Sequence, residues 1–227
     1  MATVDLERAP GDTSACGAEY HPRVDVTVVD HPLAARLLTS LRDETTPPPV
    51  FRVLAKRLAL VIVLEALRDL PTRRISVRTP LAKTDGFELE EVVAVPILRA
   101  GLGMLEATAE LLPDIAVGYL GLERDEASLR PQSYYRKLPD VAGRHVLVLD
   151  PMLATGGSGT AACAAVKEGG PRSVRFACVV AAPEGIERMR ADHPDVRIFT
   201  AAIDARLDEH GYIVPGLGDF GDRLFGT

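Results

Sequence analysis

Residues 145–162 read HVLVLDPMLATGGSGTAA and carry the strongest structural signal in the chain. Val146–Leu149 are four consecutive apolar residues, a run typical of a strand that is buried on both faces of a parallel sheet. Asp150 follows this strand, at the edge where open α/β sheets bind their ligands. A glycine-rich turn then leads into residues 160–167, whose pattern predicts a helix. The stretch therefore predicts one βα unit with a ligand site between strand and helix.

The turn after Asp150 has the features of a phosphate-binding loop. Backbone N–H groups at the start of a helix converge on one point, and the helix dipole adds positive potential there. Thr155 and Ser158 add hydroxyl donors, and no lysine follows the glycines as it does in a Walker A loop. Neutral donors suit a terminal phosphate, and the Asp150 carboxylate suits sugar hydroxyls or a metal bound to them. The pattern predicts a ribose 5-phosphate site; the alternative is a tight turn whose glycines only relieve strain.

The remaining chain repeats the order strand, loop and helix. We expect further strands at 24–29, 74–79, 92–95, 115–122, 174–182 and 196–201, and further helices at 31–42, 53–70, 102–112 and 186–191. Residues 43–49 contain three consecutive prolines and predict a break, residues 1–22 predict a loose extension, and the glycine-rich tail after Ile203 predicts irregular backbone rather than a helix. Repeated βα units imply an α/β fold with a mostly parallel sheet flanked by helices, in one domain over residues 23–227.

Composition narrows the class of protein. The chain has 227 residues, of which 47% are hydrophobic, enough for one substantial core. A net charge of −6 argues against a nucleic-acid-binding surface. Three cysteines without metal-ligand spacing suit a reducing compartment. Charges at Asp5, Glu7 and Arg8 interrupt any signal peptide, and Leu58–Leu64 is too short to span a membrane, so we expect a cytoplasmic protein.

Three further stretches, taken with the glycine-rich turn, resemble one family. DPMLATGGS resembles the phosphoribosyl-diphosphate loop of the type I phosphoribosyltransferases, and Asp150-Pro151 resembles its uracil phosphoribosyltransferase branch. VPILRAGLGM at 95–104 is similar to the loop that grips the diphosphate, and ERDEASLRPQSYYRKLP at 123–139 is similar to the flexible loop that closes over the donor. YIVPGLGDFGD at 212–222 resembles the uracil-binding segment. The resemblance covers about residues 24–227.

This resemblance implies a fold, a reaction and a set of site residues. The fold is the type I phosphoribosyltransferase fold, with a small hood built from about residues 23–45 and 203–227. The reaction converts uracil and 5-phosphoribosyl 1-diphosphate into UMP and diphosphate, a step of pyrimidine salvage. Catalytic roles fall on Asp150, Arg99 and Asp219. Donor-binding roles fall on Arg99, Arg124, Asp150, Pro151, Met152, Leu153, Ala154, Thr155, Gly156, Gly157, Ser158 and Asp219. Uracil-binding roles, largely through the backbone, fall on Ile213, Gly218, Asp219 and Phe220.

The resemblance also implies the cofactor and the partners. Mg²⁺ is expected to be held mainly by the donor, GTP is an effector in some relatives, and a homo-oligomer, dimer or tetramer, is expected, with neither nucleic acid nor membrane as partner. Glu123 departs from a tyrosine that the family more often has, and Phe220 from an alanine that is frequent in bacterial relatives. Two alternatives stay open. One is a phosphoribosyltransferase for orotate or a purine, against which Asp150-Pro151 and the tail count; the other is a regulator of the same fold, against which the intact loops count.

Overall fold

A computed structural model describes residues 26–124 and 131–227, and these form a nine-stranded sheet at the centre of the molecule. The strands run in the order β1-β11-β10-β8-β4-β6-β7, with β5 beside β4 and β9 beside β10. Neighbouring strands are parallel, except that β7 joins β6 antiparallel. Their bounds are β1 Val26–Val28, β4 Val92–Leu98, β5 Ala116–Val117, β6 Tyr119–Arg124, β7 Pro131–Lys137, β8 His145–Leu149, β9 Met152–Leu153, β10 Ser173–Ala181 and β11 Arg197–Ile203. The predicted α/β fold with a mostly parallel sheet is confirmed.

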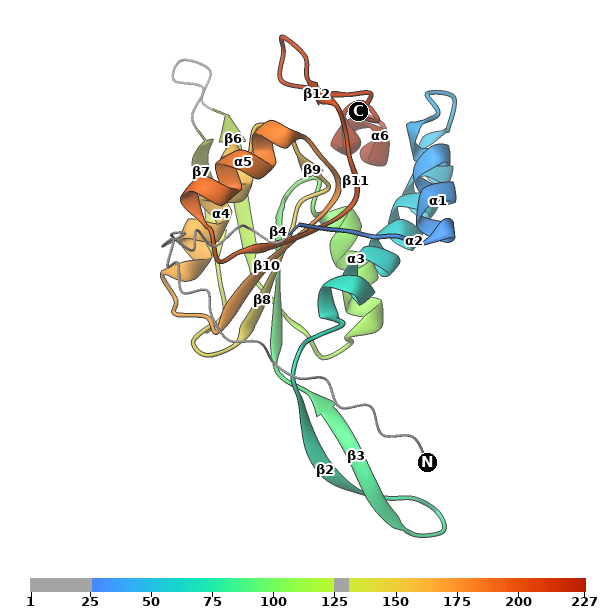
Figure 1. Ribbon diagram of the computed structural model, residues 1–227, viewed down its shortest axis with the longest axis vertical. Coiled ribbons are helices and arrows are strands. Elements are labelled where there is room, and N and C mark those ends of the chain that lie inside the picture. The colour runs from blue at the N-terminus through green and yellow to red at the C-terminus, as the bar shows by residue number, and fades with distance from the viewer. Residues whose placement is uncertain (1–25, 125–130) are drawn as a thin grey trace, which may run out of the picture.

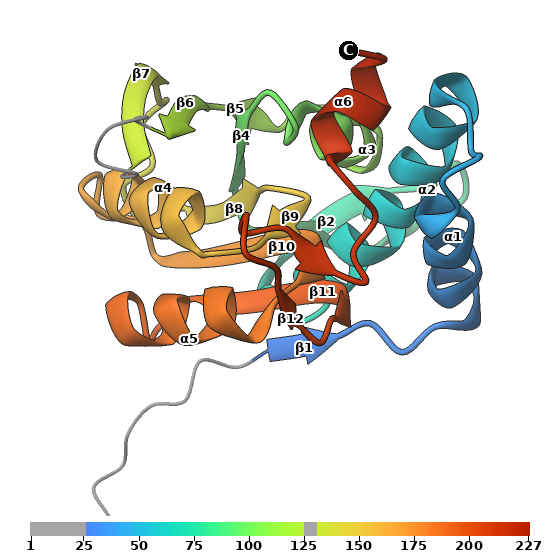
Figure 2. The same cartoon turned by 90° about the horizontal axis from the view of Figure 1, so that it is seen from above.

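Helices cover both faces of this sheet, as Figures 1 and 2 show. One face carries α1 (Pro32–Arg42), α2 (Pro48–Leu67), α3 (Leu102–Leu111) and α6 (Phe220–Phe225). The other face carries α4 (Gly157–Lys167) and α5 (Pro183–Asp192). Among the described residues, none of these helices has the length and apolar character needed to cross a membrane.

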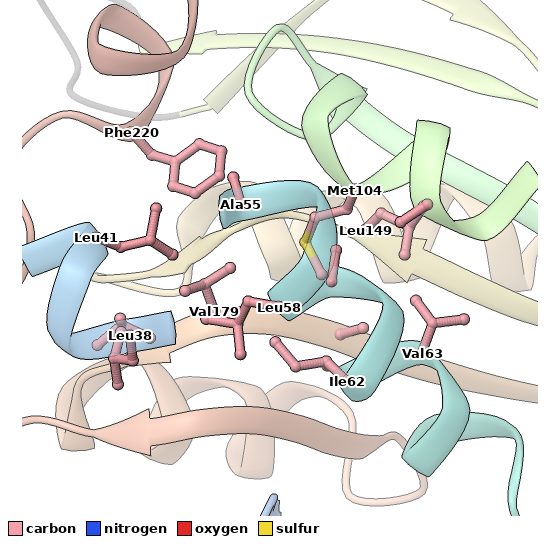
Figure 3. Close-up of a cluster of buried hydrophobic side chains, with 14 of the residues drawn as sticks. Leu38, Leu41, Ala55, Leu58, Ile62, Val63, Met104, Leu149, Val179 and Phe220 are labelled. Carbon is pink, nitrogen blue, oxygen red and sulfur yellow. The ribbon is translucent and has the colours of Figure 1, made fainter. Parts of the chain in front are cut away.

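The central strand β8 shows why the sheet is buried on both faces. Leu147 and Leu149 pack into the cluster beneath α2 and α3, part of which Figure 3 shows, whereas Val146 and Val148 pack into the cluster beneath α4 and α5. Side chains alternate between the two faces of a strand, so a strand covered on both sides must be apolar throughout. Each such side chain stabilises the fold by about 1.5–3 kcal/mol. The interpretation of Val146–Leu149 as a doubly buried strand is confirmed.

Two small antiparallel pairs lie outside the main sheet. β12 (Arg206–Leu207) pairs with β13 (Ile213–Val214) within the tail. β2 (Thr72–Arg78) pairs with β3 (Lys83–Leu89) in a hairpin that projects far from the body in Figure 1. The sequence predicted β2 but not β3, because β3 reads KTDGFEL, a polar segment interrupted by Gly86.

The second helix begins five residues before its predicted start. α2 starts at Pro48, not at Val53, because proline lacks the N–H that the first turn of a helix leaves without a partner, and its fixed φ suits that turn. It also ends earlier, at Leu67 rather than Leu70, since Pro71 disfavours helical backbone in the residue before it. The predicted break therefore covers residues 43–47 only.

Two predictions of irregular backbone were wrong in part. The tail does contain a helix, α6, which Asp219 caps by accepting a hydrogen bond of 2.9 Å from the N–H of Asp222. Gly226 ends this helix with a left-handed φ of +76°, a conformation that glycine adopts without strain. Within the predicted loop at 123–139, residues 131–137 form β7, paired with β6. The predicted extension at 1–22 and residues 125–130 of that loop lie outside the described part of the chain.

Candidate active site

A cavity of about 330 Å³ opens at the carboxyl edge of the sheet. Three segments that are far apart in the sequence form its wall. The segment after β8 contributes Asp150, Met152 and Ala154, and the segment after β4 contributes Ala100. The tail contributes the rest of the wall, namely His210, Gly211, Tyr212, Ile213, Gly218, Asp219, Phe220 and Gly221. The predicted sugar-binding carboxylate and the predicted base-binding segment therefore share one cavity.

The Asp150 carboxyl keeps partial exposure to this cavity but is otherwise enclosed by protein. Enclosure by protein, which disfavours the charged form, raises its pKa to about 7, and a hydrogen bond from the backbone of Met152 opposes part of that rise. A carboxylate so weakly hydrated gains free energy from any hydroxyl donor or cation that enters the cavity. The site is thus prepared for a polyhydroxylated or metal-bound ligand.

The glycine-rich turn leads from β9 into the N-terminus of α4. Gly156 stands before the helix with a φ of +76°, and no side chain caps the first turn. The N–H groups of that turn therefore stay available to an anion. Thr155 and Ser158 are half-buried beside them. Met152 and Ala154 place this turn on the wall of the cavity.

The first residues of α5 brace the same turn from behind. A Cβ on Gly185 would lie 2.5 Å from the carbonyl oxygen of Ala154 and 2.8 Å from that of Leu153. A Cβ on Gly156 would lie 2.9 Å from the carbonyl oxygen of Gly185. The backbones of the turn and of α5 are in direct contact, and only glycine permits this distance. No signal in the sequence marks Gly185, because its partner is a backbone that becomes its neighbour only in the folded chain.

The segment after β4 turns sharply against β8. The Leu98–Arg99 peptide bond is cis, and a Cβ on Gly101 would lie 2.4 Å from the carbonyl oxygen of Leu149. Arg99 is 63% exposed and lies beside α6, with its guanidinium 4.0 Å from the Asp222 carboxylate and 5.8 Å from the centre of the Phe225 ring. The structure thus places the backbone of this segment at the cavity through Ala100, while the Arg99 side chain lies next to it rather than in its wall.

Two residues of the tail, Gly218 and Phe220, offer the cavity their backbone rather than a side chain. Phe220 turns its side chain into the core, where it meets the Phe51 ring edge to face at 5.2 Å (Figure 3 shows Phe220 beside Leu41). Gly218 has a φ of +78° and no side chain. The groups that these two residues offer to a ligand are therefore N–H and C=O. Asp219 adds a carboxylate that its capping bond to Asp222 holds in place.

The remaining predicted site residues follow from the same elements. Pro151, Leu153 and Gly157 are buried within the turn and the start of α4. Arg124 is the last residue of β6, and its side chain lies outside the described part of the structure. Five residues on the wall were not predicted as site residues: Ala100, His210, Gly211, Tyr212 and Gly221. Their closeness in sequence to Arg99, Ile213 and Phe220 is the signal that could have found them.

A second cavity, of about 450 Å³, lies at the opposite edge of the sheet. Its wall includes Glu90, Glu91 and Arg144, which stand where β4 and β8 begin. Glu90 pairs there with Arg172 and bonds to the ring of His145, and Glu91 pairs with Arg144. These ion pairs tie the amino ends of neighbouring strands together. The cavity lies away from the glycine-rich turn, so it is not the candidate site.

Comparison with known proteins agrees with this geometry. The family model described as "Uracil phosphoribosyltransferase" matches residues 28–227. Curated proteins of that name from Dictyoglomus thermophilum and Salinibacter ruber are 51% and 50% identical over 205 residues, which is 89% of this chain and 99% and 98% of theirs. The solved structure of the AQ2163 protein from Aquifex aeolicus superposes with a TM-score of 0.86 at 39% identity, over 89% of this chain and 98% of that one.

The family match spans all of the described fold except its first two residues, and it includes all three segments of the cavity wall. The relatives are similar over nearly their full length, so the likeness is not confined to the glycine-rich turn that many nucleotide-binding proteins share. On these grounds the chain belongs to the uracil phosphoribosyltransferase family.

Proposed function

We propose that this chain transfers the phosphoribosyl group of 5-phosphoribosyl 1-diphosphate to uracil, giving UMP and diphosphate. The observation that carries the proposal is the shared cavity, where Asp150 faces the tail from Gly218 to Phe220. A reaction between a sugar phosphate and a base needs a sugar site and a base site in contact. Holding both reactants in one cavity supplies much of the rate enhancement, because it removes the entropic cost of their meeting.

In this proposal the donor lies along the glycine-rich turn. The amides at the start of α4, with the hydroxyls of Thr155 and Ser158, bind the 5-phosphate. Asp150 accepts hydrogen bonds from ribose hydroxyls, and Asp219 lines the same cavity. The transferred sugar develops positive charge as the diphosphate leaves, and two fixed carboxylates stabilise such charge electrostatically.

Mg²⁺ is proposed as the cofactor, held mainly by the donor. Magnesium is commonly bound by one or two carboxylates together with substrate phosphates, and Asp150 and Asp219 offer carboxylate oxygens on one cavity. When bound, the ion neutralises the leaving diphosphate. Arg99 adds a guanidinium for the same diphosphate, and it is exposed enough to rotate from α6 toward the cavity.

Uracil is proposed to bind to the backbone of the tail. Its two carbonyls and its ring N–H groups match main-chain donors and acceptors at Ile213, Gly218, Asp219 and Phe220. Arg223, the cation nearest in sequence, donates to the carbonyls of Leu41, Leu217 and Asp43 and stacks over Phe51. Because these contacts occupy its guanidinium, it is not free to neutralise the carboxylate of orotate.

We further infer the surroundings in which the reaction takes place. Residues at about 23–45 and 203–227 form the hood over the cavity, and the protein acts in the cytoplasm, with GTP as a candidate effector. The chain assembles as a homo-oligomer. The hairpin β2–β3 supports the last point, because it exposes 98% of Leu81 and 69% of Phe87, and an isolated two-stranded hairpin is marginally stable in water. Arg78 and Lys83 near its tip also suit a second copy, since the chain carries a net charge of −6.

The test compares four bases at equal concentration with 5-phosphoribosyl 1-diphosphate and Mg²⁺. Uracil is expected to be consumed, while orotate, cytosine and hypoxanthine are left. Orotate would bury an unpaired charge, cytosine reverses donors and acceptors, and hypoxanthine is too large. A site built from hydrogen bonds rejects such analogues by roughly four to five orders of magnitude. Comparable turnover of orotate or hypoxanthine would contradict the uracil assignment, and no turnover of any base would favour the regulator.

A further inference from the structure

One ion pair behind the cavity holds the tail that forms its wall. We infer that Arg42 and Asp204 position the backbone that reads uracil, an inference that rests on the function proposed above. Neither residue belongs to the wall of the cavity. Both therefore act through the tail, as positioning residues rather than catalytic ones.

The pair binds both backbone polar groups of a single residue, Gly216. The Asp204 carboxylate accepts from both Nη atoms of Arg42, at 2.8 and 2.6 Å, and from the N–H of Gly216 at 2.9 Å. Arg42 Nη1 also donates to the carbonyl oxygen of Gly216 at 2.7 Å. The Asp204 side chain is only 5% exposed, so water competes little for these bonds. Gly216 is thus fixed on both sides by one charged group of each sign.

The two partners belong to well-anchored elements. Arg42 is the last residue of α1, and Asp204 follows β11 directly, with its own N–H bonded to the carbonyl oxygen of Ala181 at 2.8 Å. The tail cannot slide along the sheet without separating a largely buried, hydrogen-bonded charge pair, which is costly when only one partner is left behind.

This constraint reaches the cavity within two residues. Gly216 has a φ of +57°, and a Cβ there would lie 2.0 Å from the carbonyl oxygen of Ile213. The Gly216 backbone therefore packs directly against β13, with no room for a side chain. Arg223 donates a hydrogen bond of 2.7 Å to the carbonyl oxygen of Leu217, and the next residue, Gly218, lies on the wall of the cavity. Hydrogen bonds weaken steeply with misalignment, so a backbone that reads a base must be fixed to a fraction of an ångström.

Asp204→Asn tests the inference because both carboxylate oxygens accept from Arg42, so the NH₂ group faces a guanidinium donor in either orientation, and in one orientation it faces the Gly216 N–H as well. The KM for uracil is expected to rise roughly tenfold to a hundredfold, and the KM for 5-phosphoribosyl 1-diphosphate by a smaller factor, because Asp219 is the one proposed donor-binding residue in this segment. Amide exchange at residues 216–220 is expected to quicken, while exchange in the turn at 154–159 stays unchanged. A role limited to stability would lower the active fraction and leave both KM values unchanged.

Two further variants complete the design. Asp69→Asn is the control, since the Asp69 side chain is 51% exposed and pairs with Arg175 and Arg197 at the other edge of the sheet, and both KM values are expected to stay unchanged. Arg42→Lys keeps the charge but loses the forked geometry, so a smaller rise in the KM for uracil is expected. This variant carries the test if Asp204→Asn does not fold.

The inference is overturned if Asp204→Asn and Arg42→Lys both leave the KM for uracil and the exchange at 216–220 unchanged. In that case the wild type would still convert uracil, so the proposed function would be unaffected. If the wild type does not use uracil, the proposed function fails separately. The exchange measurement then still decides whether the pair holds the tail.

Discussion

Asp150 stands at the end of β8 with a carboxyl that faces the cavity. Asp150→Asn keeps the shape of the side chain but removes its charge. Loss of one charged contact to the transition state typically costs about 3 kcal/mol, roughly a hundredfold in rate. We expect kcat with uracil to fall by about that factor. Steady-state kinetics measures it, circular dichroism checks that the fold persists, and turnover near that of the wild type would show that Asp150 does not have this role.

The raised pKa of Asp150 makes a separate prediction about stability. The carboxyl has a pKa of about 7 in the folded protein and an ordinary value of 3.8 in the unfolded chain. Between these values the unfolded chain loses its proton first, so the folded state loses stability as the pH rises from 4 to 7. Asp150→Asn removes this loss. Without ligands, the variant therefore gains stability relative to the wild type as the pH rises. The difference between their free energies of unfolding, variant minus wild type, is expected to be about 2–3 kcal/mol larger at pH 8 than at pH 5.

Urea denaturation of both proteins at the two pH values measures this difference. Asparagine carries no charge at either pH, so effects of the substitution that do not depend on ionisation cancel between the two pH values. The difference reports the ionisation of Asp150, including the stronger hydrogen bond that Met152 gives to the charged form. An advantage of the same size at pH 5 and pH 8 would mean that the Asp150 carboxyl titrates normally.

Alanine substitutions at Gly101 and Gly143 distinguish the loss of stability caused by steric crowding from that caused by backbone strain. Gly101→Ala places a Cβ 2.4 Å from the carbonyl oxygen of Leu149, and overpacking of this kind costs up to about 3 kcal/mol or more. Gly143→Ala meets nothing within 4 Å but has a φ of +68°, which costs about 1–2 kcal/mol. We expect thermal denaturation to show the larger loss for Gly101→Ala. Only that variant should also raise the KM for the donor, because only Gly101 lies next to Arg99.

The contact between α5 and the glycine-rich turn carries a prediction about a whole element. Gly185→Ala must push the turn away from α5, since its Cβ would lie 2.5 Å from the carbonyl oxygen of Ala154. The KM for 5-phosphoribosyl 1-diphosphate is expected to rise at least about tenfold, with little change in the KM for uracil. Gly170→Ala, with open space around the new Cβ, serves as the control. Equal effects on both substrates would show that α5 does not brace the turn specifically.

Elements whose own residues determine them were predictable from the sequence. β8 and α4 follow from an apolar run, a carboxylate and a glycine-rich turn within eighteen residues, although α4 begins at Gly157, three residues before its predicted start. α1 follows from its helical spacing of leucines. Asp150 and Arg99 could be assigned to one edge of the sheet because parallel strands end at the same edge. Ile213 and Asp219 were assigned to the site from the resemblance of the tail to the family's uracil-binding segment.

Other features depend on partners that are remote in sequence. α6 has six residues and no strong periodicity; its cap at Asp219 and its packing of Phe220 on Phe51 make it a helix. The direction of the Arg99 side chain depends on Asp222 and Phe225 in that same helix. No local pattern near residue 99 encodes that neighbour, so the sequence could locate Arg99 at the edge of the sheet but not orient it.

The hairpin β2–β3 sets the shape of the whole molecule, because it extends well beyond the compact α/β body in Figure 1. We expect the wild type to elute as an oligomer whose mass by light scattering is a multiple of 24.4 kDa. Phe87→Asp combined with Leu81→Asp puts charge on its most exposed apolar positions and is expected to reduce that mass. Leu33→Asp, at a position 46% exposed in the first turn of α1, is the control. An unchanged mass in the double variant would exclude the hairpin from the interface.

A base site whose wall is main chain constrains how this enzyme can evolve. The N–H and C=O groups of Gly218 and Phe220 stay the same whatever side chain stands there, and the Phe220 side chain is directed into the core. Single-codon changes in this segment, other than to proline, therefore alter packing and leave the pattern of donors and acceptors intact. A switch to another base would require an insertion or deletion that re-routes the tail. Point mutations in this segment are therefore expected to preserve the choice of base.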